Sequence, residues 1–300
     1  MRSVTVLAPA KLNLTLDITG TAENGYHLLD MMMQAVSLYE CVRVEKDEDL
    51  TVVLPGSRVP GGKHNTAYQA ALAFFEETGL LAGARITIYK KTPVRAGMAG
   101  GSADAAAVLV GLSQLYGARL SLPELCAIGL KVGADVPFSL MGGTARVQGI
   151  GDILKAEPAC PRCWFTVVMP AQGVSTPRAY ALYDEKGTRH RPDNDRVEAA
   201  LCRGDLAELC AGMGNALQDS SPSRHNEPIC AALREQGALA AQMTGSGAAV
   251  FGVFDTEEKA VQAKEFLQQM YPQCWVLHPV SRGAHVRRPR RGRRPRKKQD

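Results

Sequence analysis

One stretch of the chain decides the fold: residues 92–117 have the sequence TPVRAGMAGGSADAAAVLVGLSQLYG. Its first half is rich in glycine. Alanines and aliphatic residues without proline follow, which predicts a loop that leads into a helix. Residues 84–91, just before it, alternate between apolar and polar side chains, as is typical of a half-buried strand. The sequence therefore predicts a strand, a glycine loop and a helix that ends at Gly117.

The glycine loop has the features of a phosphate-binding site. Glycines let the backbone approach a ligand closely, and Ser102 is the expected N-cap of the helix. The N–H groups of the first helical turn and the positive end of the helix dipole would then face an anion. The loop lacks the lysine of a Walker A motif after Gly101, and it lacks the spacing of a dinucleotide fingerprint. From the residues alone, a turn that only packs a helix on a strand remains an alternative.

The N-terminal segment alternates over residues 3–18. One face of the expected strand carries Leu12, Leu14, Leu16 and Ile18, and the other carries Lys11, Asn13, Thr15 and Asp17. A surface strand with a solvated polar side would have this pattern. The alternation also predicts that Lys11 and Asn13 point in the same direction.

A second helix is expected to precede a possible catalytic carboxylate. Ser121 and Glu124 form a capping box around Pro123, and this helix should run to about residue 132. Gly133 is a suitable C-terminal cap and Pro137 cannot continue the helix, so Asp135 is expected in a tight turn. An aspartate that only hydrogen-bonds its own turn is the commoner alternative.

Several separated motifs together resemble one family. The pattern Pro-x-x-x-Gly-Met-Ala-Gly-Gly-Ser-Ala-Asp-Ala-Ala, from Pro93 to Ala106, resembles the nucleotide loop of the GHMP small-molecule kinases. Four further elements occur in the family's order: Lys-Leu-Asn at 11–13, Gly-Tyr-His at 25–27, Gly-Ala-Asp-Val-Pro at 133–137 and Gly-Ser-Gly at 245–247. Within this superfamily the chain is most similar to the kinases that act on 4-diphosphocytidyl-2-C-methyl-D-erythritol. The resemblance covers roughly residues 5–280.

The resemblance implies a role for each motif. Asp135 would be the catalytic base and Lys11 its catalytic partner. The nucleotide would be bound by Pro93, Val94, Arg95, Ala96, Gly97, Met98, Ala99, Gly100, Gly101, Ser102 and Ala103. The substrate would be bound by Asn13, Tyr26, His27, Tyr180, Gly245, Ser246 and Gly247. Tyr26 and Tyr180 would stack on the two faces of a cytosine with His27 at its polar edge, although Tyr183 is close enough in sequence to replace Tyr180. Ala103 stands where many members have a second serine, which leaves no hydroxyl at that position.

The implied reaction is transfer of a phosphate from ATP to the 2-hydroxyl of 4-diphosphocytidyl-2-C-methyl-D-erythritol, in the non-mevalonate route to isoprenoid precursors. Mg²⁺ is expected with ATP, but no residue is assigned to it. Two alternatives remain: a GHMP kinase for homoserine or a mevalonate-type alcohol, and a non-catalytic binder of nucleotides or nucleic acid. Gly-Tyr-His argues against the first, and Lys11 together with Asp135 argues against the second.

Length and charge suggest how the chain is divided. The 300 residues are 45% hydrophobic, which is ample for two modest α+β domains with the active site between them. We expect an N-terminal domain at 1–157, a C-terminal domain at 158–281 and a disordered basic tail at 282–300. Residues 281–300 contain ten Lys or Arg and a single acidic residue, so the rest of the chain carries a formal charge of about −4. The tail lacks interleaved aromatic residues, so nucleic-acid binding is not the favoured interpretation.

The cysteines and the hydropathy pattern indicate a cytoplasmic protein without a membrane partner. Eight cysteines show no disulfide framework, and the N-terminus does not resemble a secretory signal. No stretch approaches the ~18–20 apolar residues of a membrane span. Cys160 and Cys163 form a lone C-x-x-C without the second pair that a zinc site needs. The only partner expected is the small-molecule substrate, and the sequence does not indicate an oligomeric state.

Overall fold

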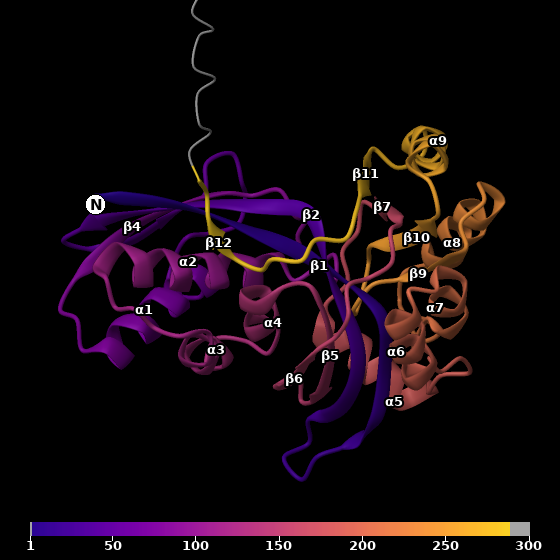
Figure 1. Ribbon diagram of the computed structural model, residues 1–300, viewed down its shortest axis with the longest axis horizontal. Helices are drawn as coiled ribbons and strands as arrows, with labels where there is room; N and C mark the ends of the chain where they lie inside the picture. The colour runs from indigo at the N-terminus through magenta and orange to yellow at the C-terminus, as the bar shows by residue number, and fades with distance from the viewer. Residues whose placement is uncertain (1, 289–300) are drawn as a thin grey trace, which may run out of the picture.

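The computed structural model describes residues 2–288 and contains two sheets with helices against them (Figure 1). The first sheet has the strand order β12-β1-β2-β4-β3, β5 pairs with β2 and β6, and β8 pairs with β1. Its strands are β1 (Ser3–Thr21), β2 (His27–Asp47), β3 (Leu50–Val53), β4 (Gly83–Tyr89), β5 (Thr144–Gly149), β6 (Ile153–Ala156), β8 (Gly214–Asn215) and β12 (His285–Val286). One face of this sheet is covered by α1 (Thr66–Thr78), α2 (Gly100–Tyr116), α3 (Leu122–Leu130) and α4 (Asp135–Met141).

The second sheet is antiparallel, with the order β11-β7-β10-β9. Its strands are β7 (Trp164–Met169), β9 (Ala240–Met243), β10 (Val250–Phe254) and β11 (Gln273–Leu277). The helices of this half are α5 (Thr176–Lys186), α6 (Asn194–Arg203), α7 (Leu206–Gly212), α8 (Asn226–Glu235) and α9 (Glu257–Gln268). The expected α+β class is therefore confirmed. Among residues 2–288, no helix is long and apolar enough to cross a membrane.

The long hairpin of β1 and β2 passes through both halves of the molecule (Figure 1). The two strands pair antiparallel, and the register shifts between Asn13 and Thr15. Before this irregularity, Leu12 and Leu14 pack in one apolar cluster; after it, Leu16 and Ile18 belong to another. The expected single apolar face is therefore wrong, because a bulge breaks the alternation at this point.

The alternative of a solvated polar face on β1 is excluded by the structure. Lys11 is 5% exposed, and Asn13 and Thr15 are fully buried. The second half of the chain covers this face: the backbone N–H of Asn13 donates to Thr244 Oγ1, and Thr15 Oγ1 donates to Asn194 Oδ1. Burial without loss of hydrogen bonds is how polar side chains are accommodated inside proteins.

The boundary expected after residue 157 falls in the irregular segment that joins β6 to β7. Because β1 and β2 contribute to apolar clusters on both sides of this boundary, the two halves share core residues.

The tail does not begin at residue 282. Residues 285–286 pair with β1, the Ala284 N–H donates to Ser139 O at 2.8 Å, and the Arg287 N–H donates to Thr5 O at 2.8 Å. These are backbone hydrogen bonds, so a composition poor in apolar side chains does not prevent them. The prediction of disorder is thus wrong for 282–288, and residues 289–300 lie outside the described part of the chain.

Candidate active site

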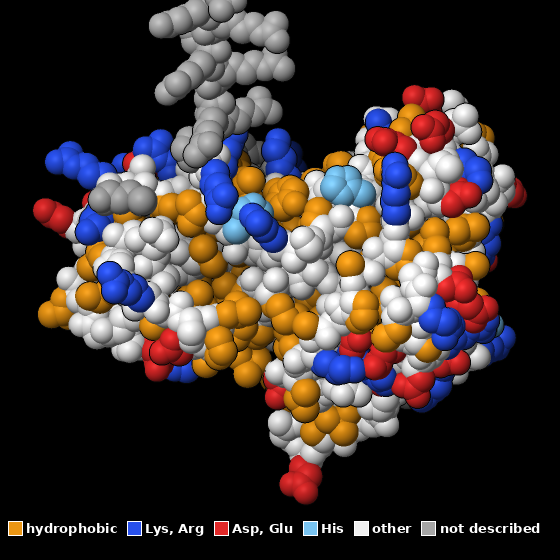
Figure 2. Space-filling view, in the orientation of Figure 1, with side chains coloured by type: hydrophobic (Ala, Val, Ile, Leu, Met, Phe, Trp, Pro, Cys, Tyr) orange, Lys and Arg blue, Asp and Glu red, His pale blue; other side chains and the backbone are white. Residues whose placement is uncertain are grey.

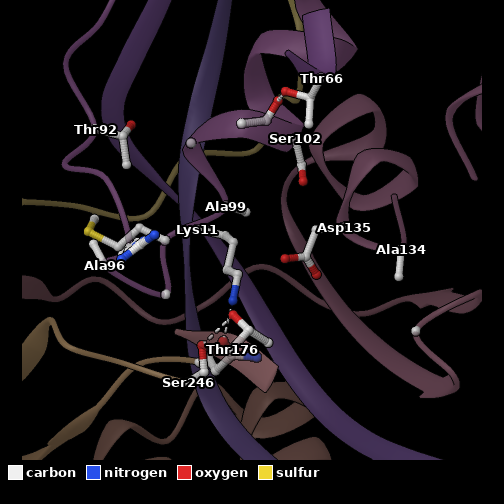
Figure 3. A pocket seen from close by; sticks show the side chains of 18 of the residues that line it. Lys11, Thr66, Thr92, Ala96, Ala99, Ser102, Ala134, Asp135, Thr176 and Ser246 are labelled. Atoms are coloured by element: carbon white, nitrogen blue, oxygen red, sulfur yellow. Dashed lines mark hydrogen bonds between the residues drawn. The ribbon is translucent and has the colours of Figure 1, made fainter. Parts of the chain in front are cut away.

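A cavity of about 1000 Å³ lies between the two halves and collects most of the predicted site residues. Figure 3 shows Lys11 on β1 and Asp135 on α4 pointing into the same space, with Ser102 on one side of it and Ser246 and Thr176 on the other. Every residue from 93 to 102 lines this cavity, as do Asn13, Tyr26, His27, Tyr180, Gly245 and Ser246. Ala103 and Gly247 do not. Six segments distant in sequence therefore converge on one space.

The start of α2 leaves its first N–H groups free for a ligand. The helix begins at Gly100, and its N-cap is Ala99, in a left-handed conformation with φ 56° and without a side-chain hydrogen bond. The first helical bond is donated by the Ala103 N–H to Ala99 O. The prediction of Ser102 as the N-cap is therefore wrong: Ser102 lies in the first turn. This arrangement favours an anion more than the predicted one, because no side chain occupies the N–H groups at the end of the helix.

A second glycine loop, at residues 244–247, packs against the glycine loop at residues 93–102. A Cβ on Gly97 would lie 2.0 Å from Thr244 O, so only glycine allows this approach, and its φ of 73° also requires glycine. The N–H groups of Ala248 and Ala249 donate to Arg95 O and Ala96 O at 3.1 and 3.2 Å. The two loops are thus held together by backbone hydrogen bonds, which explains why Gly247 is absent from the cavity wall.

Lys11 and Asn13 point the same way, as the alternation predicts: Lys11 Nζ donates to Asn13 Oδ1. Burial lowers the pKa of the Lys11 ammonium, and the charge of Asp135 partly opposes this effect. Asp135 is the first residue of α4, not part of a turn between other elements. Pro137 is tolerated within this short helix because the N–H groups of a first turn have no partner inside the helix. An incompletely neutralised cation and a carboxylate therefore face one cavity.

The opposite end of the cavity carries aromatic side chains. His27 stacks on Tyr180, with ring centroids 4.8 Å apart and an interplanar angle of 29°, and Tyr26 is 64% exposed. Tyr180 lines the cavity and Tyr183 does not. Burial, with a smaller contribution from the charge of Asp135, raises the pKa of the Tyr180 hydroxyl. The sequence did not predict that His27 would cover one face of Tyr180.

Asp184 is a further residue that the sequence missed. Asp184 lies in α5, the helix that also carries Tyr180, and its Oδ1 is 2.7 Å from His27 Nε2. A carboxylate at this distance holds one ring nitrogen and so fixes the orientation of the imidazole. The spacing of four residues between Tyr180 and Asp184 places both on one helix face, which is the only signal of this arrangement in the sequence.

A largely buried ionic cluster next to the glycine loop at residues 93–102 was also missed. Lys90 Nζ lies 2.8 Å from Glu40 Oε1 and 2.7 Å from Asp104 Oδ2, and it donates to Gly100 O at 3.2 Å. Burial lowers the pKa of Lys90 and the two carboxylates raise it, with a net upward shift. Burial raises the pKa of Asp104 to about 7. No local sequence pattern joins β2, β4 and α2, so this cluster could not be read from spacing.

Other cavity residues come from segments to which no function was assigned. Asn65 caps α1 through a bond from the Ala67 N–H, and Thr66 Oγ1 donates to Gly101 O at 2.8 Å. On the far wall, Thr176 Oγ1 and Ser246 Oγ lie 2.9 Å apart. These contacts attach α1 and α5 to the two glycine loops.

Comparison with known proteins agrees with the motifs. The family model for the GHMP kinases N terminal domain matches residues 65–143, and the one for GHMP kinases C terminal matches residues 197–273. A 4-diphosphocytidyl-2-C-methyl-D-erythritol kinase of Alkaliphilus metalliredigens is 38% identical over 94% of this chain and 98% of its own length. The Clostridium perfringens enzyme of the same name is 40% identical over 88% of this chain and 93% of its own.

Two solved structures show which part of the identification rests on the fold and which part rests on the sequence. A crystal structure of 4-(cytidine 5'-diphospho)-2C-methyl-D-erythritol kinase has a TM-score of 0.78 and 31% identity over 92% of this chain and 98% of its own. The homoserine kinase of Cytophaga hutchinsonii has the same TM-score at 18% identity, covering 95% of this chain and 98% of its own. Since both superpose equally well, the fold defines only the class, and the chain is a GHMP-type small-molecule kinase. The sequence identities are more specific: the chain belongs to the 4-diphosphocytidyl-2-C-methyl-D-erythritol kinase family.

Proposed function

We propose that the chain transfers the γ-phosphoryl group of ATP to the 2-hydroxyl of 4-diphosphocytidyl-2-C-methyl-D-erythritol, in the non-mevalonate route to isoprenoid precursors. The observation that carries this proposal is the content of one cavity: an uncapped helix N-terminus at one end, an aromatic cluster at the other, and Lys11 and Asp135 between them. The names of the relatives support the same substrate.

In this proposal Asp135 accepts the proton of the substrate hydroxyl. An alcohol is a poor nucleophile, and a carboxylate placed to take its proton lowers the barrier as the new P–O bond forms. Lys11 serves as the adjacent cation. It offsets negative charge on the transferring group. Lys11 is held by its hydrogen bond to Asn13, so it is preorganised before the substrate binds.

The residues also fit ATP. The N–H groups at the start of α2 suit phosphate oxygens, and Gly97 and Gly100 let the loop pack closely on Thr244 and Thr92. In phosphoryl transfer, positioning and charge stabilisation supply most of the rate enhancement. The two hydrogen-bonded glycine loops, with α1 attached to Gly101, provide a rigid support for this purpose.

Mg²⁺ is part of the proposal through ATP. The described residues contain no cluster of three or more His, Cys, Asp or Glu able to hold a metal by themselves, which fits an ion that takes most of its ligands from phosphates and water. Ser102 and Asp135, which both face the cavity, are the side chains suited to complete its shell. When bound, the ion would neutralise charge on the phosphates.

The cytosine is proposed to bind at the aromatic end, against Tyr26 and Tyr180, with His27 oriented by Asp184. A cytoplasmic location belongs to the same proposal and is supported by the eight cysteines, all free thiols.

The test is a coupled ADP-release assay on the purified chain with ATP and Mg²⁺. We expect turnover with 4-diphosphocytidyl-2-C-methyl-D-erythritol and little with homoserine or mevalonate. Preference for either of the other alcohols would replace the proposed substrate within the same class of kinase. The uridine analogue of the substrate is a sharper control, since it differs only at the edge of the base that His27 is proposed to contact.

A further inference from the structure

The Cys160–Cys163 pair is a feature that phosphate transfer does not use. It lies in the irregular segment between β6 and β7, and neither cysteine lines the cavity. In the structure the two Sγ atoms are 3.9 Å apart. Elsewhere among residues 2–288 no other two cysteine sulfurs make such a contact. The folded chain therefore brings together one specific pair of its eight thiols.

The geometry allows this pair to be joined. A disulfide bond is about 2 Å long, so the two sulfurs need to approach by about 2 Å from their present separation. Each sulfur can move by rotation about a single bond, and the segment that carries Cys160 belongs to no helix or strand. Its backbone is attached to Thr144 by two hydrogen bonds: the Glu157 N–H donates to Thr144 O at 2.9 Å, and the Cys160 N–H donates to Thr144 Oγ1 at 3.2 Å. No regular element has to be broken for the bond to form.

The two thiols differ in a way that assigns each a role. Cys160 is partly exposed, whereas Cys163 is 2% exposed. The hydrogen bond to Cys160, together with burial, raises the pKa of Cys163. Cys163 is therefore the thiol that keeps its proton, and Cys160 is the cysteine of the pair that solvent reaches. Accessible thiolates are the reactive form of cysteine.

We propose that Cys160 and Cys163 form a reversible intramolecular disulfide when the protein meets a hydroperoxide. The Cys160 thiolate attacks one peroxide oxygen, the O–O bond breaks, hydroxide leaves and a sulfenic acid forms. The sulfur of Cys163 then attacks the Cys160 sulfur; the S–S bond forms, the S–O bond breaks, and the oxygen leaves as water with the proton of Cys163. Two thiols and hydrogen peroxide give one disulfide and two waters. A dithiol reverses the step by thiol–disulfide exchange.

The test treats the reduced full-length protein with hydrogen peroxide, blocks remaining thiols with N-ethylmaleimide and maps peptides after trypsin. Because trypsin cuts after Arg162, between the two cysteines, the disulfide appears as two linked peptides, which dithiothreitol separates. We expect this linked pair to be the main product at low peroxide. Mapping in the wild-type chain keeps the result independent of whether any variant folds.

Three variants sharpen the result. In Cys163→Ser, oxidation should stop at a Cys160 sulfenic acid that dimedone traps; in Cys160→Ser, oxidation in this segment should be lost. Cys202→Ser removes an exposed cysteine outside the pair and should leave the linked peptides unchanged. A Cys163–Cys210 linkage, equal oxidation of all accessible cysteines, or no disulfide in the wild-type chain would each overturn the proposal.

Discussion

The buried Lys11 and the largely buried Lys90 line the same cavity, and their surroundings are opposite. Lys90 touches the carboxylates of Glu40 and Asp104, and its pKa is raised. Within residues 2–288 the Lys11 ammonium has a single side-chain hydrogen bond, to the neutral Asn13, and its pKa is lowered by burial. A cation that is paired with carboxylates inside the protein holds the surrounding structure together. A cation without such a partner is available to interact with a bound ligand. We therefore propose that Lys90 supports the glycine loop at residues 93–102 and that Lys11 takes part in the reaction.

This comparison also explains the position of each group. Lys90 joins β4 to the first turns of α2, through Asp104 and Gly100 O, so it fixes the loop whose N–H groups face the cavity. Glu40 accepts bonds from the N–H groups of Lys91 and Thr92, which extends the same support along the chain. On the face drawn in Figure 2 the charged side chains lie mainly toward the edges, whereas Glu40 and Asp104 are buried inside the molecule.

The largest effect is expected from Asp135→Asn. The substitution keeps the size of the side chain and removes the base, so kcat should fall by roughly 10²–10⁴-fold, with the KM for ATP and for the alcohol largely kept. Steady-state kinetics of ADP release measures both. Asp255→Asn, on the exposed surface near Lys259, is the matched control and should be near normal. A near-normal kcat in Asp135→Asn would mean that Asp135 is not the base and only begins α4.

A smaller effect is expected at the aromatic end. Stacking on an aromatic ring is worth ~1–3 kcal/mol per base, so Tyr26→Ala should raise the KM for the cytidylyl substrate by roughly 10-fold. The KM for ATP should change little. Tyr271→Ala serves as the control, because Tyr271 lies outside the cavity wall and its aromatic contact is with His225. An unchanged substrate KM in both Tyr26→Ala and Tyr180→Ala would remove the aromatic clamp from the account.

The ionic cluster beneath the loop should titrate near neutrality. The pKa of Asp104 is raised to about 7 from 3.8, so between these values the folded chain binds a proton that the unfolded chain does not. The contribution of Asp104 to the free energy of unfolding therefore falls as pH rises through this window. Asp104→Asn cannot titrate.

Melting temperatures of the wild type and Asp104→Asn, measured from about pH 5 to about pH 8, check this expectation. The melting temperature of Asp104→Asn should increase relative to that of the wild type as pH rises. The melting temperature of Asp255→Asn should change with pH in the same way as that of the wild type. If the melting temperature of Asp104→Asn instead fell relative to that of the wild type at higher pH, the ionised Asp104–Lys90 pair would be the more stable form.

The smallest effect is expected at the C-terminus. Truncation after Arg288 removes only residues outside the described part of the chain and should leave kcat and the melting temperature nearly unchanged. Truncation after Val280 also removes β12 and its bonds to β1 and α4, so it should lower the melting temperature. Equal melting temperatures for the two truncations would show that the 282–288 segment adds no stability.

The sequence predicted those parts of the site that rest on local patterns. Alternation placed Lys11 and Asn13 on one face, and glycine content placed the loop before α2. Features made by non-local packing were missed: the bulge near Leu14 depends on pairing with β2, and the Lys90 cluster depends on three elements meeting. Ser102 had the right chemistry for an N-cap, but the left-handed Ala99 starts the helix three residues earlier.

The comparison of the two lysines is tested most directly by measuring Lys11→Met and Lys90→Met side by side, for kcat and for stability in urea. Lys11→Met should lower kcat by roughly 10²–10³-fold while stability is kept or improved, because a buried cation with a lowered pKa has been removed. Lys90→Met should lose about 3–5 kcal/mol of stability, since Glu40 and Asp104 are then left buried without their cation. The reverse result, with kcat kept and stability lost in Lys11→Met, would contradict the assignment of Lys11 to the reaction.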